Sequence, residues 1–249
     1  MKEIDEIIEL LKYNTNFNDH NDDFIDKLNN RILNFAKNPS SNDLKTLLSL
    51  IKTKSQGLIA KIILNLVYTI GEIGKKVEIP SDIINFLINF YFKSDQWIRK
   101  EIVESLGKIG TNQNLDEKSL RLLYNSLNDD YADLRLKALE ILAANEKHHS
   151  IKYAYILISL LDNQNPVIKE NASKILKMLI KEENTLVEIL KNSKLELNKF
   201  HIRNLVVLFS DSVFKLHKLK EAIGNSDLSD EIKGMFFSEI DTIIKIISK

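Results

Sequence analysis

Apolar residues recur at intervals of three and four positions along almost the whole chain. Short stretches rich in Asn, Asp and Ser separate the apolar segments and supply candidate N-cap residues. The pattern predicts about fourteen helices. Because the connections are short, we expect successive helices to be antiparallel neighbours. Among the predicted helices are the ranges 2–13, 21–37, 42–53, 55–73 and 228–248.

The predicted helices repeat with a period of about 35 residues. The segment Gly71-Glu72-Ile73-Gly74 recurs 36 positions later as Gly107-Lys108-Ile109-Gly110, and its glycines are expected at helix ends, as C′ residues. An apolar-basic dipeptide recurs at spacings of 36, 34 and 34, as Ile98-Arg99, Leu134-Arg135, Ile168-Lys169 and Ile202-Arg203. Division of the chain by this period gives about seven helical hairpins.

A two-helix unit of this size cannot bury its own apolar face, so it is stabilised by stacking on its neighbours. Segment 83–92 has this character, because Asn85 and Asn89 form one narrow polar stripe on an otherwise apolar helix. Segment 153–161 has the same pattern. The pattern therefore predicts an all-α fold in a single domain, 1–249, with capping hairpins at 1–37 and 212–249.

Composition narrows the class of protein further. The 249 residues include 7 Gly, 3 Pro and no Cys, whereas average usage would give about 17 Gly and 12 Pro. Few glycines argue against sheet folds and Gly-rich nucleotide-binding folds. Without Cys the chain has no disulfide framework, Cys-based zinc site or thiol chemistry. No apolar stretch approaches a membrane span of about 18 residues, and the acidic, amphipathic N-terminus is unlike a signal peptide, so a cytoplasmic location is expected.

Two segments resemble HEAT repeats: Asp95-Gln96-Trp97-Ile98-Arg99 and Asp130-Tyr131-Ala132-Asp133-Leu134-Arg135. The family pattern has an Asp in the turn within the hairpin and an apolar-Arg pair opening the second helix. The next unit has Lys169 in place of the Arg, Ile202-Arg203 keeps only the dipeptide, and the usual Pro of the first helix is missing. The resemblance implies a right-handed α-solenoid of about seven HEAT-like hairpins. Armadillo and tetratricopeptide arrays are the alternatives.

The same resemblance implies a structural ladder, in which turn aspartates and helix-start bases bond within and between repeats. Its members in this chain are Asp95, Arg99, Asp130, Arg135, Lys169 and Arg203. The alternative interpretation of the basic series is a stripe that holds an acidic partner.

No motif indicates catalysis, a metal or a cofactor, and none of these is expected. There is no HExxH helix, and His148-His149 is expected to be a solvated pair in a loop. A Ser, His and Asp triad stays open, because triads are defined in space.

Nucleic-acid binding is the second hypothesis, because an alkylpurine glycosylase with HEAT-like repeats has a similar length. That resemblance would imply a basic groove with several Trp and an acidic catalytic residue. Here Trp97 is the only Trp and is expected to be a turn or core anchor, and the net charge is +0. Charge is uneven, since residues 1–30 sum to −5 and residues 31–80 to +5, which indicates two solvated faces or a bipolar surface that steers a charged partner.

The favoured function is a non-catalytic scaffold or adaptor that binds a partner protein on the concave surface. The second helices of the hairpins should line that surface, and they are expected at about 55–73, 95–110, 130–145, 165–181 and 200–211. The contact candidates are Lys100, Glu104, Lys137, Glu140 and Lys177. An accessory role in chromophore attachment is a third hypothesis, since short HEAT-like repeats occur in such proteins. The wide apolar surface of the last helix is expected to be buried on the preceding hairpin or to seat another protein.

Overall fold

The computed structural model describes residues 22–35, 37, 60–145, 148–192 and 196–248. These described residues form twelve α-helices and three short 3₁₀ segments, with no strand among them. The chain divides into two compact units, 1–141 and 142–249, and the boundary falls inside one helix. The predicted helices 2–13 and 42–53, and most of the predicted N-terminal cap 1–37, lie outside the described residues. None of the described helices is long and apolar enough to cross a membrane.

The first unit contains six described helices. Their bounds are α2 (Asp22–Phe35), α4 (Ala60–Gly74), α5 (Ser81–Tyr91), α6 (Gln96–Ile109), α7 (Glu117–Asn125) and α8 (Ala132–Ala144), the last of which runs through the unit boundary. A 3₁₀ turn, η1 (Ser126–Asn128), extends α7. Polar N-cap residues fix where α6 and α7 begin. The Asp95 carboxylate accepts hydrogen bonds from the N–H groups of Trp97 and Ile98, and the Asp116 carboxylate accepts one from the N–H group of Ser119.

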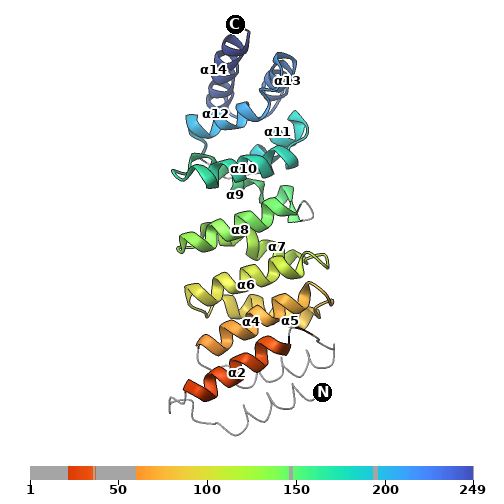
Figure 1. Cartoon of the computed structure of the whole chain (residues 1–249). Helices are drawn as coiled ribbons and strands as arrows, with labels where there is room; N and C mark the ends of the chain where they lie inside the picture. The colour runs from red at the N-terminus through yellow and green to blue at the C-terminus, as the bar shows by residue number, and fades with distance from the viewer. Residues whose placement is uncertain (1–21, 36, 38–59, 146–147, 193–195, 249) are drawn as a thin grey trace. The chain divides into compact units, whose positions relative to one another are not determined.

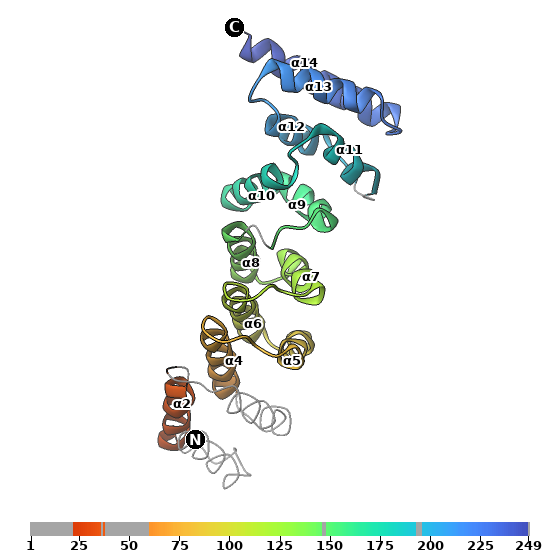
Figure 2. The ribbon, with the colours of Figure 1, turned by 90° about the vertical axis from the view of Figure 1, so that its right-hand side faces the viewer.

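The first unit is built of two helix layers. Second helices form one layer, in which α2 packs on α4 and α4 packs along α6, while α5 packs on α7 in the other layer (Figures 1 and 2). Hydrophobic residues that are fully buried between the layers include Ile70, Leu87, Ile102, Leu106 and Leu123. Each hairpin buries its apolar face against the next one, which is the packing of an α-solenoid.

The second unit repeats this packing. Its helices are α9 (Ala154–Ser159), α10 (Pro166–Leu179), α11 (Glu183–Asn192), α12 (Lys199–Leu208), α13 (Val213–Gly224) and α14 (Asp230–Ile247). Contacts join α9 with α11, α10 with α12, α11 with α13 and α12 with α14. The predicted helix 153–161 is shorter than expected, because 3₁₀ turns η3 (Ile151–Tyr153) and η4 (Leu160–Asp162) replace its ends.

The last hairpin, α13 with α14, corresponds to the predicted segment 212–249. Phe236 and Ile240 of α14 are fully buried, in agreement with the expected burial on the preceding elements. The end of α14 is more open, since Ile246 and Ile247 are exposed. Phe237 and Ile244 are half-buried, so the solvent-facing part of the predicted apolar surface is largest at the C-terminal end of α14.

The glycine prediction is right for Gly74, which is the last residue of α4, and for Gly110, which is the C-cap of α6, but it is wrong for Gly71 and Gly107. Gly71 and Gly107 lie inside α4 and α6 rather than at C′ positions, and no described glycine has a positive φ. A Cβ on Gly71 would lie 2.6 Å from Ser105 Oγ and 2.8 Å from Ser105 Cα, and a Cβ on Gly107 would lie 2.8 Å from Ile141 Cδ1. The glycines therefore allow close approach between neighbouring second helices, which explains why they recur with the repeat.

Candidate protein-binding face

A shallow hollow of about 190 Å³ lies between two second helices of the first unit. Lys100 and Glu104 of α6 line one side, and Asp133, Lys137 and Glu140 of α8 line the other. Leu136 contributes the apolar part of the lining. We call this hollow the α6–α8 groove. Four of the five contact candidates from the sequence thus surround one hollow, because positions three and four apart share a helix face.

Charges in the α6–α8 groove are paired along each helix. Lys100 Nζ lies 3.9 Å from Glu104 Oε1, and Lys137 Nζ lies 3.2 Å from Glu140 Oε2. These four side chains are 23–50% exposed, so each pair stabilises the helix by only about 0.3–0.5 kcal/mol. Such pairs can be exchanged for contacts with another molecule at low cost.

Lys177, the fifth contact candidate, belongs to the second unit. It projects from α10, and its Nζ lies 2.9 Å from Asp211 Oδ1. Both side chains are about half exposed, at 56% and 44%. Lys177 therefore belongs to a different local surface from the α6–α8 groove.

The predicted ladder is centred on Asp129, which sequence reasoning passed over in favour of Asp130. Asp129 accepts two hydrogen bonds from Arg99, from Nε at 2.9 Å and from Nη2 at 2.8 Å. It also accepts the Tyr91 hydroxyl at 2.7 Å and the Tyr131 N–H at 3.0 Å. Burial alone would raise the pKa of Asp129, but these hydrogen bonds outweigh it and hold the pKa below the ordinary 3.8. The network joins the α5–α6 hairpin to the turn between α7 and α8 in the next hairpin.

The other ladder residues have different partners. Asp95 caps α6, and Arg135 Nη1 donates to the carbonyls of Asp129, at 2.6 Å, and Asp130, at 3.1 Å. Within the described residues, Lys169 and Arg203 make no ion pair with a turn aspartate. The aspartates are replaced by Asn163 and Asn165 before α10 and by Asn198 before α12.

At α12 in the second unit, two hydrogen bonds between repeats come from amides instead of guanidinium groups. Asn198 Nδ2 donates to Asp162 Oδ2 at 2.9 Å, and Asn204 Nδ2 donates to the Leu161 carbonyl at 3.0 Å. Asn198 also forms a capping box with His201, whose Nδ1 accepts the Asn198 N–H. The second unit thus joins neighbouring repeats through different residues. This explains why the apolar-basic dipeptide loses its aspartate partner in the repeats after Arg135.

Tyr91 gives the Asp129 network a spectroscopic signature. Burial raises the pKa of Tyr91 to about 12, and its hydrogen bond to Asp129 contributes to the rise. We expect Tyr91 to ionise near pH 12 in an absorbance titration at 295 nm, and Tyr91→Phe to reduce the absorbance change in that range. Because the folded-state pKa is raised, the stabilisation from Tyr91 is complete below pH 10 and is lost as the pH rises through 12. Ionisation of every tyrosine near pH 10 would contradict this assignment.

Trp97 is exposed, which corrects the expectation of a core anchor. Trp97 is 57% exposed as a residue, and its ring packs edge-on against Tyr131, with ring centroids 5.5 Å apart. The Tyr131 hydroxyl donates to Asp133 Oδ2 at 3.0 Å. Trp97, Lys100 and Glu104 follow one another at helical spacing on α6, so the aromatic pair lies at the N-terminal end of the α6–α8 groove. Sequence reasoning noted Trp97 but could not foresee the Tyr131 contact.

A second charged cluster, also missed from the sequence, lies between α4 and α6. Lys108 Nζ is 3.1 Å from Glu72, 3.6 Å from Glu101 and 4.2 Å from the Tyr68 ring centroid, and Lys75 adds a 2.9 Å pair with Glu72. Burial raises the pKa of Glu101, whereas hydrogen bonds from Lys75 and Lys108 outweigh burial and lower that of Glu72. Two carboxylates are matched by two ammonium groups, so the cluster is internally neutralised.

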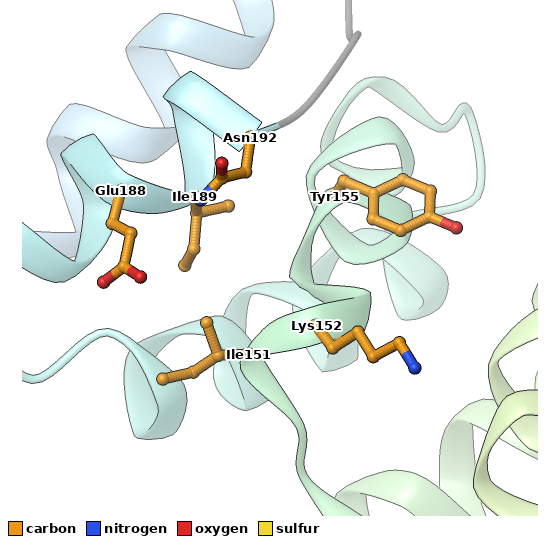
Figure 3. Close-up of a pocket in the computed structure, with 6 residues that line it drawn as sticks. All are labelled: Ile151, Lys152, Tyr155, Glu188, Ile189 and Asn192. Carbon is orange, nitrogen blue, oxygen red and sulfur yellow. The ribbon is translucent and has the colours of Figure 1, made fainter. Parts of the chain in front are cut away.

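The second unit has a pocket of about 370 Å³ between its first helices (Figure 3). Ile151 and Tyr155, from η3 and α9, and Ile189, from α11, form its apolar walls. Lys152, Glu188 and Asn192 supply the polar lining. Ile151 and Tyr155 are 47% and 42% exposed, so this pocket is an open, partly apolar hollow.

The histidine prediction is wrong in part. His148 is buried, with 2% of its surface exposed, and the His149 ring nitrogen Nε2 lies 2.8 Å from the Leu142 carbonyl. The pair is therefore packed and hydrogen-bonded rather than solvated. Among the described residues, no group of three or more His, Asp or Glu side chains is placed to hold a metal ion.

The stacked hairpins of each unit define an all-α helical-repeat protein of the α-solenoid class. No protein-family model matches the sequence, and no curated protein matches it at a significant level.

Solved structures to which the chain is similar include three that it matches over most of its length. The complex of CpcE and CpcF of phycocyanin lyase from Nostoc sp. PCC7120 is 13% identical, with 94% of this chain and 93% of that chain covered and a TM-score of 0.47. A designed armadillo repeat protein in complex with the peptide (KR)4 is 14% identical, with 97% and 99% covered and a TM-score of 0.43. An engineered protein is 14% identical, with 96% and 97% covered and a TM-score of 0.45. None of these likenesses is close enough to indicate a function.

Proposed function

We propose that the protein is a non-catalytic scaffold or adaptor that binds a partner protein on the face formed by its second helices. The α6–α8 groove is the observation that carries the proposal. Its lining combines two lysines, three carboxylates and one leucine. Mixed charge of this kind gives specificity through charge register and does not suit a polyanion, which needs an excess of basic groups.

We further propose a HEAT-like assignment of the repeats and a cytoplasmic location. Asp95 as N-cap and Arg99 at the start of α6 support the HEAT-like assignment. A single array over 1–249 is also a proposal, supported by the continuity of α8 across the boundary at 141 and 142. In this proposal the second helices line one concave surface.

Site-specific photocrosslinking tests the scaffold proposal. A photoreactive phenylalanine analogue replaces Leu136 in the groove, and in a matched control it replaces Arg121, an exposed residue of α7 in the other helix layer. We expect a stoichiometric protein adduct in extracts of the native host from position 136 and none from position 121. Neutralising the groove with Lys100→Ala, Glu104→Ala, Lys137→Ala and Glu140→Ala should reduce the adduct about tenfold or more.

The neutralised variant is expected to fold normally, because each removed pair contributes only about 0.3–0.5 kcal/mol. Equal adducts from positions 121 and 136, or an adduct insensitive to neutralisation, would refute the scaffold proposal. A nuclease-sensitive adduct would instead support the nucleic-acid hypothesis.

A further inference from the structure

Charged side chains alternate in sign along the α6–α8 groove. Lys100 of α6 and Lys137 of α8 occupy one level, and Glu104 and Glu140 occupy the next. Both helices are second helices of successive hairpins with an offset of 36 residues. Glu140 is therefore the equivalent of Glu104, and Lys137 lies one position beyond the equivalent of Lys100, about 1.5 Å further along the helix axis. Each level thus holds two like charges from two helices. Like charges on one level favour a single opposite charge placed between them.

The aromatic pair extends the series by one level. Trp97 and Tyr131 lie before the two lysines, and Asp133 accepts the Tyr131 hydroxyl there. An exposed Trp face beside a carboxylate attracts a cationic side chain, through the ring quadrupole and through charge. The groove thus offers three levels in the order cation-binding, anion-binding and cation-binding.

The spacing of these levels matches a partner helix. Trp97, Lys100 and Glu104 stand three and four residues apart, which corresponds to about 4.5 and 6 Å along the helix axis. A partner helix places side chains at the same intervals when they occupy positions i, i+3 and i+7. An extended strand would place same-face side chains about 6.6 Å apart at every step and would fit the first interval less well.

We propose that the α6–α8 groove binds a partner helix carrying a basic, an acidic and a basic side chain at positions i, i+3 and i+7. This inference rests on the proposed scaffold function and adds the chemistry of the partner. The first basic side chain packs on Trp97 and Tyr131 beside Asp133. The acidic side chain lies between Lys100 and Lys137, and the second basic side chain lies between Glu104 and Glu140. A partner helix that runs in the opposite direction would need the same charge order at i, i+4 and i+7, because the two intervals differ in length.

Fluorescence of Trp97 tests the proposal without a label, because Trp97 is the only tryptophan in the chain. An alanine-rich helical peptide with Arg, Glu and Arg at i, i+3 and i+7 is titrated into the full chain. We expect a saturable change in emission with a Kd of about 0.1–1 mM. A peptide with Glu, Arg and Glu at the same positions should bind about tenfold or more weakly.

Two variants locate the contact. Asp133→Asn keeps an acceptor for Tyr131 but removes the charge, and Tyr131→Ala removes the ring; each should weaken binding about threefold. Glu188→Gln, which removes one exposed carboxylate in the second unit, is the matched control and should leave the Kd unchanged. A protein that keeps its far-UV circular dichroism but loses affinity would show that the ring and charge act on the peptide.

No saturable change up to about 5 mM peptide, or equal responses to the two charge orders, would overturn the inference. If photocrosslinking at position 136 still yields a partner in that case, the scaffold function stands and only the partner chemistry is wrong. If both experiments fail, the scaffold proposal fails too.

Discussion

Asp129→Ala is expected to destabilise the first unit by about 3 kcal/mol. The Asp129 side chain is only 8% exposed and accepts hydrogen bonds from Arg99, Tyr91 and the Tyr131 N–H. Removing the carboxylate leaves the part-buried Arg99 guanidinium and the buried Tyr91 hydroxyl without their shared acceptor, and such unpaired groups carry the full cost of desolvation. Guanidinium unfolding followed by far-UV circular dichroism measures the loss.

The matched control is the exposed pair between Lys177 and Asp211. It also joins neighbouring hairpins, with a distance of 2.9 Å, but its side chains are 56% and 44% exposed. Asp211→Ala should therefore leave the free energy of unfolding nearly unchanged. A cost for Asp129→Ala as small as that of Asp211→Ala would show that the network adds little to the fold.

The Asp129 network also predicts a pH dependence. Because the folded-state pKa of Asp129 lies below its ordinary value of 3.8, its contribution to stability is present above pH 3.8 and is lost as the pH falls through the folded pKa. Asp129→Asn removes the titrating group, so it should flatten this part of the acid unfolding curve. An unchanged acid limb in Asp129→Asn would contradict the lowered pKa.

Gly71→Ala is expected to destabilise the protein by about 2–3 kcal/mol, although alanine is the better helix former by about 1 kcal/mol. The new Cβ would lie 2.6 Å from Ser105 Oγ and 2.8 Å from Ser105 Cα. Ser105 cannot turn away freely, because it is buried and its hydroxyl donates to the Val67 carbonyl at 2.8 Å. The contact with Cα involves the α6 backbone, so α4 and α6 must move apart.

Gly234 is the matched control for Gly71. It also lies within a helix, α14, but a Cβ there would meet no atom within 4 Å. Gly234→Ala should therefore stabilise the protein by about 0.5–1 kcal/mol, which is opposite in sign to the effect of Gly71→Ala. The guanidinium unfolding midpoints of the two variants, each compared with that of the unchanged protein, measure these opposite effects. A stabilising Gly71→Ala would show that the α4–α6 contact is looser than the structure indicates.

Individual elements show how far sequence reasoning reached. The range 228–248 predicted α14 at Asp230–Ile247, and 95–110 predicted α6 at Gln96–Ile109, because apolar periodicity and polar caps are local signals. The segment 153–161 was predicted less well, since 3₁₀ turns take both ends of that helix. The four groove candidates were found from helical spacing alone, whereas their joint placement around one hollow required two helices to be packed together.

The sequence by itself determined the class of fold, because a helical period, short polar turns and a 34–36 residue repeat leave no other way to bury the apolar faces. Only the tertiary structure decided which carboxylate Arg99 binds and why a glycine stands inside the helix at both 71 and 107. It also decided that Trp97 is exposed to solvent and contacts Tyr131. These features depend on distances between residues about 30 positions apart. Such distances follow from how closely two helices approach, and that approach is decided by side-chain packing rather than by local pattern.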